Sequence, residues 1–177
     1  MSVYESHLTN HPLIRKGKVI IIMGSKSDLD WSEKIVKILD ELGVESVSRI
    51  ASAHKVLLKC YELIKEYEKE NVVFITVAGQ SNALSGFTDA QTWCPVIACP
   101  PYSDKFGGSD IFSSLRMPSA VAPMTILDPK NAALAAAKIL DLTDSRIQEK
   151  VKVFQNQART SLEKDDKEIQ NGQRKRS

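Results

Sequence analysis

Side chains suited to ligand binding and proton transfer gather in three short segments. Residues 24–28 read Gly-Ser-Lys-Ser-Asp, residues 52–55 read Ser-Ala-His-Lys, and residues 78–82 read Ala-Gly-Gln-Ser-Asn. Hydroxyls and backbone amides bind phosphate, a carboxylate accepts hydrogen bonds from ribose hydroxyls, and an ammonium binds phosphate by charge. An imidazole exchanges protons near neutral pH. The segments therefore predict a site for a phosphate, a ribose or both, with His54 beside it.

Short apolar runs indicate the strands and helices that position these segments. The runs are rich in Val and Ile, and longer amphipathic stretches separate them, as in a parallel sheet covered by helices. Strands are expected at 19–23, 44–50, 72–78, 95–99 and 121–127, and helices at 31–42, 56–69, 83–92, 110–115 and 131–140. Gly43 is expected to end the first helix. The predicted fold class is α/β, a flavodoxin-like three-layer sandwich with a five-stranded parallel sheet and a long C-terminal helix.

The sheet explains how segments so far apart in sequence can meet. In an open parallel sheet, ligands bind beyond the carboxyl ends of the strands, where loops and helix N-termini converge. The polar segments follow the first three strands, so we expect them to line one crevice. Residues 102–118, which follow a proline pair at the end of the fourth strand, are either a lid or an ordinary loop.

Each polar segment also has an ordinary structural interpretation. Ser27 or Asp28 can cap the following helix, and residues 24–28 lack the spacing and the Gly-Lys-Ser/Thr ending of a Walker loop. A lone histidine is often structural, but His54 lies in the expected crevice beside Lys55. The residues alone leave both interpretations open.

The sequence divides into a main domain, an extension before it and a long helix after it. Residues 1–17 form an N-terminal extension, in which His7 and His11 have a spacing that would suit a metal ion, the alternative being a solvated arm. Residues 18–142 form the main domain, and 143–177 a long helix with a polar tail. The helix carries an apolar stripe of Ile147, Val151, Phe154, Ala158 and Leu162. Sequence does not decide whether the stripe packs on its own domain or on a neighbour.

Composition narrows the class of protein. A chain of 177 residues with a net charge of +2, from 24 basic and 22 acidic residues, has no strong field to hold nucleic acid or an anionic membrane. The longest apolar run, 19–23, is far too short to cross a bilayer, and no signal peptide is recognised. Cys60, Cys94 and Cys99 are expected to be reduced thiols, which favours a cytoplasmic protein.

The three polar segments resemble those of the aminoimidazole ribonucleotide (AIR) carboxylase family in their order, their spacing and their position at strand ends. The resemblance covers residues 18–142. The resemblance is to its carbon-dioxide-using branch, the class II PurE type. Lys55 stands where the mutase branch, which rearranges the N-carboxy isomer, has Arg, and residues 78–82 replace that branch's Ala-Gly-Gly-Ala-Ala-His. Residues 99–101 and 113–116 also resemble the carboxylase branch.

The resemblance implies a function in de novo purine synthesis. The expected reaction joins 5-aminoimidazole ribonucleotide and carbon dioxide into 4-carboxy-5-aminoimidazole ribonucleotide, catalysed by a stand-alone carboxy-lyase without cofactor or metal. His54 is the implied proton-transfer residue. The implied substrate-binding residues are Ser25, Asp28, Ser52, Lys55, Gly79 and Ser81. Family members assemble as homotetramers or homo-octamers, with no nucleic acid or membrane partner.

Two rival functions remain open. One is the N5-carboxyaminoimidazole ribonucleotide mutase of the same fold. The other is a non-catalytic flavodoxin-like binding module, which would need acidic residues at the strand ends where Met23 and Ala78 stand. A dinucleotide-binding enzyme is disfavoured because no Gly-x-Gly-x-x-Gly follows the first strand.

Overall fold

A parallel sheet of five strands forms the centre of the protein. The computed structural model describes residues 16–174. The strands are β1 (Lys18–Met23), β2 (Glu45–Ile50), β3 (Val72–Val77), β4 (Val96–Ala98) and β5 (Met124–Thr125). They pair in the order β2-β1-β3-β4-β5, and every pair is parallel. This is the flavodoxin-like strand order, so the expected α/β sandwich is confirmed.

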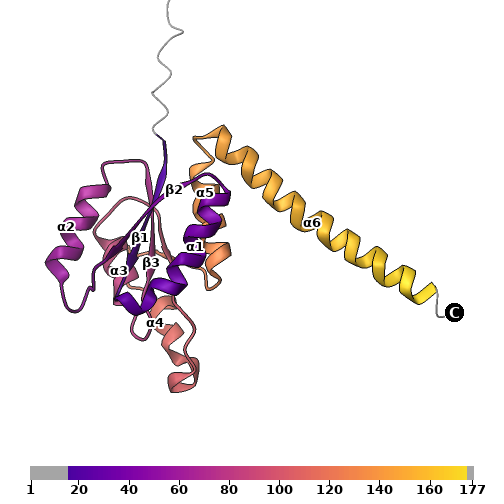
Figure 1. The fold of residues 1–177 in the computed structure, drawn as a ribbon. Coiled ribbons are helices and arrows are strands. Elements are labelled where there is room, and N and C mark those ends of the chain that lie inside the picture. Colours follow the sequence, from indigo (N-terminus) through magenta and orange to yellow (C-terminus); the bar gives the residue numbers. More distant parts are fainter. Residues whose placement is uncertain (1–15, 175–177) are drawn as a thin grey trace, which may run out of the picture.

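Helices cover both faces of the sheet (Figure 1). The elements are η1 (Lys26–Asp28), α1 (Leu29–Glu41), α2 (Leu57–Tyr67), α3 (Ala83–Ala90), η2 (Lys105–Ile111), α4 (Phe112–Leu115), α5 (Pro129–Leu140) and α6 (Ser145–Arg174). Residues of α1 and α5 pack in the core on one face, and residues of α2 and α3 pack on the other. The three layers therefore sit as the alternation of strands and helices predicts.

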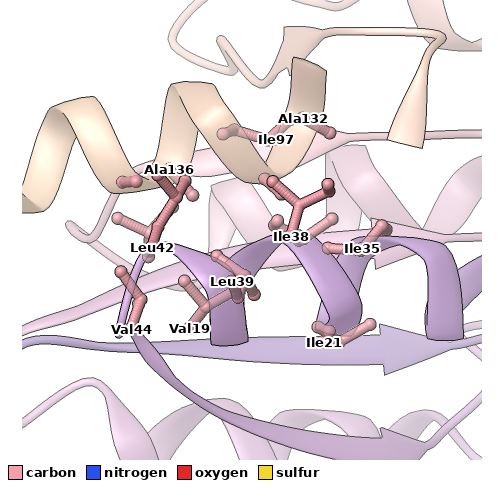
Figure 2. Close-up of a cluster of buried hydrophobic side chains, with 14 of the residues drawn as sticks. Val19, Ile21, Ile35, Ile38, Leu39, Leu42, Val44, Ile97, Ala132 and Ala136 are labelled. Atoms are coloured by element: carbon pink, nitrogen blue, oxygen red, sulfur yellow. The ribbon is translucent and has the colours of Figure 1, made fainter. Parts of the chain in front are cut away.

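Successive side chains of the central strands point to opposite faces of the sheet and so pack in both cores. Val19 and Ile21 of β1 belong to the core under α1 and α5, whereas Ile20 and Ile22 belong to the opposite core. All four are fully buried. Figure 2 shows Val19 and Ile21 beneath α1, with the alanines of α5 above. Because alanine is small, α5 packs closely against α1 and the sheet.

Gly43 ends α1 as expected. Its φ of +69° lies in the left-handed region that glycine adopts without a Cβ clash. The N–H of Gly43 donates to the carbonyl oxygen of Asp40 at 3.0 Å, and the N–H of Val44 donates to that of Leu39 at 2.8 Å. These two bonds are the pair of a Schellman cap, which turns the chain directly into β2.

Several predicted boundaries were wrong, most of all in the fourth and fifth strand regions. The strand expected at 121–127 is only Met124–Thr125, because Pro123 has no N–H to donate to a ladder. The helix expected at 110–115 is a 3-10 helix, η2, followed by the short α4. The remaining elements differ from their predicted bounds by one or two residues at one or both ends.

The structure shows which part of the apolar stripe on the C-terminal helix α6 packs on its own domain. Ile147 and Val151 are each 4% exposed and belong to the core under α5, and Phe154 packs partly against it. Leu162 is 70% exposed. Beyond its first turns, α6 extends away from the body of the protein (Figure 1). The start of the stripe therefore packs on its own domain, and the remainder does not.

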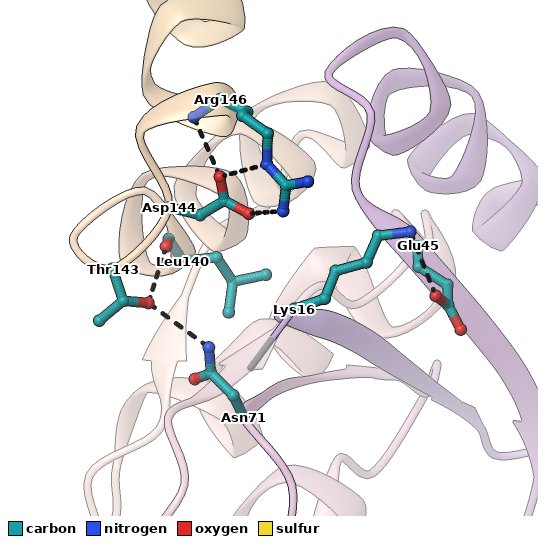
Figure 3. Close-up of polar contacts among 7 residues, drawn as sticks. All are labelled: Lys16, Glu45, Asn71, Leu140, Thr143, Asp144 and Arg146. Atoms are coloured by element: carbon teal, nitrogen blue, oxygen red, sulfur yellow. Dashed lines mark hydrogen bonds and ion pairs between the residues drawn. The ribbon is translucent and has the colours of Figure 1, made fainter. Parts of the chain in front are cut away.

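A buried carboxylate fixes the start of α6. The Oδ1 atom of Asp144 accepts from the backbone N–H of Arg146 at 2.9 Å and from its Nε at 3.0 Å, and Oδ2 accepts from Nη2 at 2.7 Å. Figure 3 shows this pair beside Thr143, whose Oγ1 donates to the carbonyl oxygen of Leu140. The hydrogen bond from the Arg146 guanidinium lowers the pKa of Asp144 from its ordinary 3.8, against the opposing effect of burial.

Replacing Asp144 should destabilise the fold in an acid-dependent way. Asp144→Ala should lower the free energy of unfolding by about 1 kcal/mol, the usual loss for a helix cap. Because the folded pKa is lowered, the carboxylate's contribution is complete above the unfolded pKa of about 4 and is lost as pH falls through the folded value. Asp144→Asn should keep the cap but flatten this dependence. Urea unfolding between pH 2.5 and 7 measures both, with the exposed Asp165→Ala as control. Equal losses in Asp144→Ala and Asp165→Ala would contradict this account.

Candidate active site

All seven residues predicted for the site line one cavity. The cavity encloses about 410 Å³ at the carboxyl edge of the sheet, between the loops that follow β1, β2 and β3. It is lined by Gly24, Ser25, Ser27, Asp28, Ser52, Ala53, His54, Lys55, Ala78, Gly79, Gln80, Ser81 and Leu84. The structure therefore brings the three polar segments together, as the sheet topology predicts.

The loop after β1 presents a carboxylate held in place by its own backbone. The N–H of Gly24 donates to the carbonyl oxygen of Val77, so the chain continues one step along the sheet before it turns. Asp28 is 8% exposed, and its Oδ2 accepts from the backbone N–H of Ser25 at 2.9 Å. The hydroxyls of Ser25 and Ser27 lie 2.5 Å apart at the mouth of the cavity. The expected side-chain cap of α1 by Asp28 is not formed, because this carboxylate instead accepts from Ser25 as the third residue of a capping box.

The loop after β2 carries the imidazole and the ammonium. The N–H of Lys55 donates to Oγ of Ser52 at 3.3 Å, and the N–H of Val56 donates to the carbonyl oxygen of Ser52 at 3.0 Å. These bonds form a tight turn that directs His54 and Lys55 to the cavity. Both side chains are exposed in the single chain. His54 is thus not a core histidine.

The loop after β3 contains a glycine and a residue with a left-handed backbone conformation. Gly79 leaves the wall of the cavity open, and a Cβ built on it would lie 3.5 Å from Cγ of Pro101. Gln80 has a φ of +58°, in the region that non-glycine residues seldom occupy. Asn82 is buried and accepts from the N–H of Ser85 as the cap of α3. Sequence analysis did not assign a role to Gln80 or Asn82, although an Asn directly before a helix is a recognised N-cap signal.

A second cavity adjoins the first. It encloses about 420 Å³ and shares Gly79 and Gln80 with it. Its other walls are Pro100, Pro101, Tyr102, Ser103, Asp104, Gly107, Gly108, Asp110, Ile111 and Leu127. The segment 102–118, predicted as a lid or a loop, therefore borders the site through this second cavity.

The thiols do not serve the site as nucleophiles. Cys60, Cys94 and Cys99 are free and buried, as expected. Burial raises the pKa of Cys60 and of Cys99 to about 11, and it also raises the pKa of Cys94. A thiol with such a pKa is protonated at neutral pH, and the thiol is a far weaker nucleophile than the thiolate.

The part of the chain that the structure covers contains neither clustered metal ligands nor a membrane-spanning helix. Among residues 16–174, no three His, Cys, Asp or Glu side chains cluster in a way that would hold a metal ion. His7 and His11 lie outside the described residues. No helix within 16–174 combines the length and apolar character needed to cross a membrane.

The arrangement suits a ligand that carries both a negative charge and hydroxyl groups. Lys55 offers a positive charge, Asp28 offers a carboxylate, and the serines offer hydroxyls within one cavity. His54 stands among them with a group that both accepts and donates a proton.

Comparison with known proteins decides the family. The AIR carboxylase family model matches residues 18–161. The chain belongs to the AIR carboxylase family. The match runs past the 18–142 expected from the sequence and includes the first half of α6.

Named relatives agree with this assignment. The chain is similar to the phosphoribosylaminoimidazole carboxylase of Archaeoglobus fulgidus, at 63% identity over 86% of this chain and 84% of the relative. The corresponding protein of Treponema denticola is 47% identical, over 85% of this chain and 96% of the relative. The human bifunctional carboxylase and succinocarboxamide synthetase is 37% identical, but the match covers only 36% of its length.

A solved structure confirms the fold of this family member. The crystal structure of Treponema denticola PurE superimposes with a TM-score of 0.84 at 47% identity, over 86% of this chain and 98% of that one. The long C-terminal helix and the five parallel strands are therefore features of an AIR carboxylase fold.

Proposed function

We propose that this chain is a phosphoribosylaminoimidazole carboxylase that uses carbon dioxide directly. The reaction joins 5-aminoimidazole ribonucleotide and carbon dioxide into 4-carboxy-5-aminoimidazole ribonucleotide, a step of purine synthesis. The observation that carries the proposal is the single cavity in which His54, Lys55 and Asp28 meet the Gly79 loop. The close relatives named as this enzyme support it.

The nucleotide is anchored at its sugar and phosphate. Lys55 and the hydroxyl of Ser52 bind the phosphate, because an ammonium and a hydroxyl donate charge-assisted hydrogen bonds to it. Asp28 accepts from the ribose hydroxyls, and Ser25 contributes its own hydroxyl. The bond from the Ser25 N–H to Oδ2 supports this role, because it fixes the direction of the carboxylate.

The chemical step requires positioning and one proton transfer. The enamine-like carbon C4 of the aminoimidazole attacks the carbon of carbon dioxide, and one C=O electron pair moves to oxygen to give a carboxylate. C4 is then tetrahedral and still carries its hydrogen. His54 removes this proton, the C–H electron pair restores the aromatic ring, and imidazolium releases the proton to solvent. The Gly79 amide and the Ser81 hydroxyl, which both line the cavity, stabilise the new carboxylate in this proposal.

The ring carbon is nucleophilic enough for this step without ATP, biotin or a metal ion. The residues that line the cavity suit that chemistry, since they offer groups that bind an anion and an imidazole that transfers a proton.

Carbon dioxide is favoured over the N-carboxy isomer as the donor. Lys55 presents a compact ammonium where the mutase branch has the planar fork of Arg, and these groups offer different donors to a carboxylate. The same-fold mutase is the second candidate. The purified enzyme should convert 5-aminoimidazole ribonucleotide with bicarbonate and without ATP, at a rate that follows dissolved carbon dioxide. Product absorbance measures the rate, and turnover with the N-carboxy isomer alone would identify the mutase.

Substituting His54 should stop the reaction without preventing binding. His54→Asn keeps a polar side chain of similar shape but removes the group that takes the proton from C4. We expect kcat to fall by about 100-fold or more, the range for loss of a general base, with nucleotide affinity within a few-fold of the native enzyme. Steady-state kinetics and calorimetric titration measure the two effects. A near-native kcat would disprove the role of His54.

Substituting Lys55 should weaken binding. Lys55→Ala removes the cation from the cavity, and loss of a charge-assisted bond should reduce nucleotide affinity by about tenfold or more. Lys59→Ala is the matched control, because Lys59 is also exposed and lies one turn further along, outside the cavity lining. Calorimetric titration measures both variants. Equal affinities for the two would remove Lys55 from the site.

We further propose that residues 18–142 form the catalytic domain and that, within 143–177, the exposed part of α6 serves assembly into a homotetramer or homo-octamer. Exposed apolar side chains support assembly in two places. Val56, Leu57 and Leu58 follow the His54 loop and are 43%, 47% and 76% exposed. On α6, Leu162 and Ile169 are 70% and 62% exposed. Such surfaces are costly in a monomer in water.

Light scattering tests the assembly. The native enzyme should have the mass of four or eight chains, and Leu162→Asp should shift it toward smaller species because a charge enters the apolar contact. Thr160→Asp on another face of α6 is the control. A monomeric native enzyme, or equal behaviour of the two variants, would refute this use of α6.

A further inference from the structure

The turn at the end of β3 keeps a backbone conformation that its own sequence does not favour. Gln80 has a φ of +58° and lies in the wall between the two cavities. A non-glycine residue holds such a conformation only where surrounding contacts impose it. Gly79 and Ser81 flank Gln80, so whatever fixes this residue also fixes both of them.

A serine from a distant segment supplies such contacts. Ser113 lies in α4, and its Oγ accepts a hydrogen bond from the backbone N–H of Asn82 at 2.9 Å. The same hydroxyl lies 2.7 Å from the carbonyl oxygen of Asp110 and 3.4 Å from that of Gln80. Its single hydrogen serves one of these acceptors at a time. Ser113 thus binds the turn at the Asn82 N–H, and it also binds the Gln80 carbonyl oxygen when its hydrogen is not given to Asp110.

The neighbouring residue anchors this bridge to the core. Ser114 is 2% exposed, and its Oγ accepts from Nδ2 of Asn82 at 2.8 Å. Its carbonyl oxygen accepts from Oγ1 of Thr125 in β5 at 2.9 Å. Asn82 is 2% exposed and also caps α3. Ser113 therefore projects from a rigid support, and it can hold the Gln80 turn rather than follow it.

A purely local role explains only part of this geometry. A serine hydroxyl often bonds to the carbonyl oxygen three residues earlier, as Ser113 does with Asp110. The bond from Asn82 spans 31 residues of sequence and serves no such local purpose. It satisfies a backbone donor in the turn that borders both cavities.

We propose that Ser113 is a positioning residue for carboxylation, acting through the backbone of residues 79–82. This inference rests on the proposed function. The hydroxyl holds the Gln80 turn so that the Gly79 amide and the Ser81 hydroxyl face the new carboxylate. Because Asp28 and Lys55 lie on other loops, Ser113 affects the carboxylation step and leaves nucleotide binding to them.

Three variants separate this role from a general effect on folding. Ser113→Ala removes the hydroxyl, and Ser113→Thr retains it at an exposed position. Ser119→Ala removes an exposed serine of the same connection between β4 and β5. The measurements are kcat, KM for 5-aminoimidazole ribonucleotide, KM for carbon dioxide, and amide hydrogen exchange at Asn82.

Ser113→Ala should lower kcat/KM for carbon dioxide by about tenfold, or about 1.4 kcal/mol of transition-state stabilisation, with KM for the nucleotide within twofold. The Asn82 amide should exchange at least several-fold faster. Ser113→Thr and Ser119→Ala should match the native enzyme in both measurements. Native exchange at Asn82 in Ser113→Ala, equal losses in the Ala and Thr variants, or a loss confined to KM for the nucleotide would overturn the proposal.

The proposed function is judged separately. Absence of turnover by the unsubstituted enzyme with carbon dioxide would contradict the carboxylase and, with it, the role of Ser113 in carboxylation. The exchange measurement needs no turnover, so it would still decide whether Ser113 holds the Gln80 turn.

Discussion

The register of three parallel strands is the constraint on which the site depends. Met23 at the end of β1 pairs with Ile50 at the end of β2 and with Val77 at the end of β3. The three strands therefore finish at the same level, and the loops that follow them leave the sheet side by side. The carboxylate, the imidazole and the glycine turn meet because of this alignment.

Burial on both faces holds that register. β1 and β3 are enclosed by helices, and a shift of one residue would exchange Ile20 and Ile22 with Val19 and Ile21 between two differently shaped cores. Close packing makes such an exchange costly. The apolar residues of β1 thus contribute to catalysis indirectly, because they fix where the chain turns at Gly24.

Sequence reasoning succeeded where the signal was local or periodic. The runs of Val and Ile located β1 and β3, Gly43 marked the end of α1, and the position of His54 after a strand placed it in the crevice. It failed where distant contacts decide the outcome. Gln80 adopts a left-handed conformation beside Ser113, and no pattern near residue 80 encodes that partner. The stripe on α6 divides between core and solvent because the body of the domain ends beneath Phe154, which periodicity does not reveal.

The most direct test of this account is a crystal structure with 4-carboxy-5-aminoimidazole ribonucleotide bound. We predict that the phosphate contacts Lys55 and Ser52 and that the ribose contacts Asp28. The carboxylated ring carbon should lie within about 3.5 Å of a His54 nitrogen, near the range required for proton transfer. A nucleotide bound outside the cavity, or one whose ring carbon is remote from His54, would contradict the central claim that the three strand-end loops form one catalytic site.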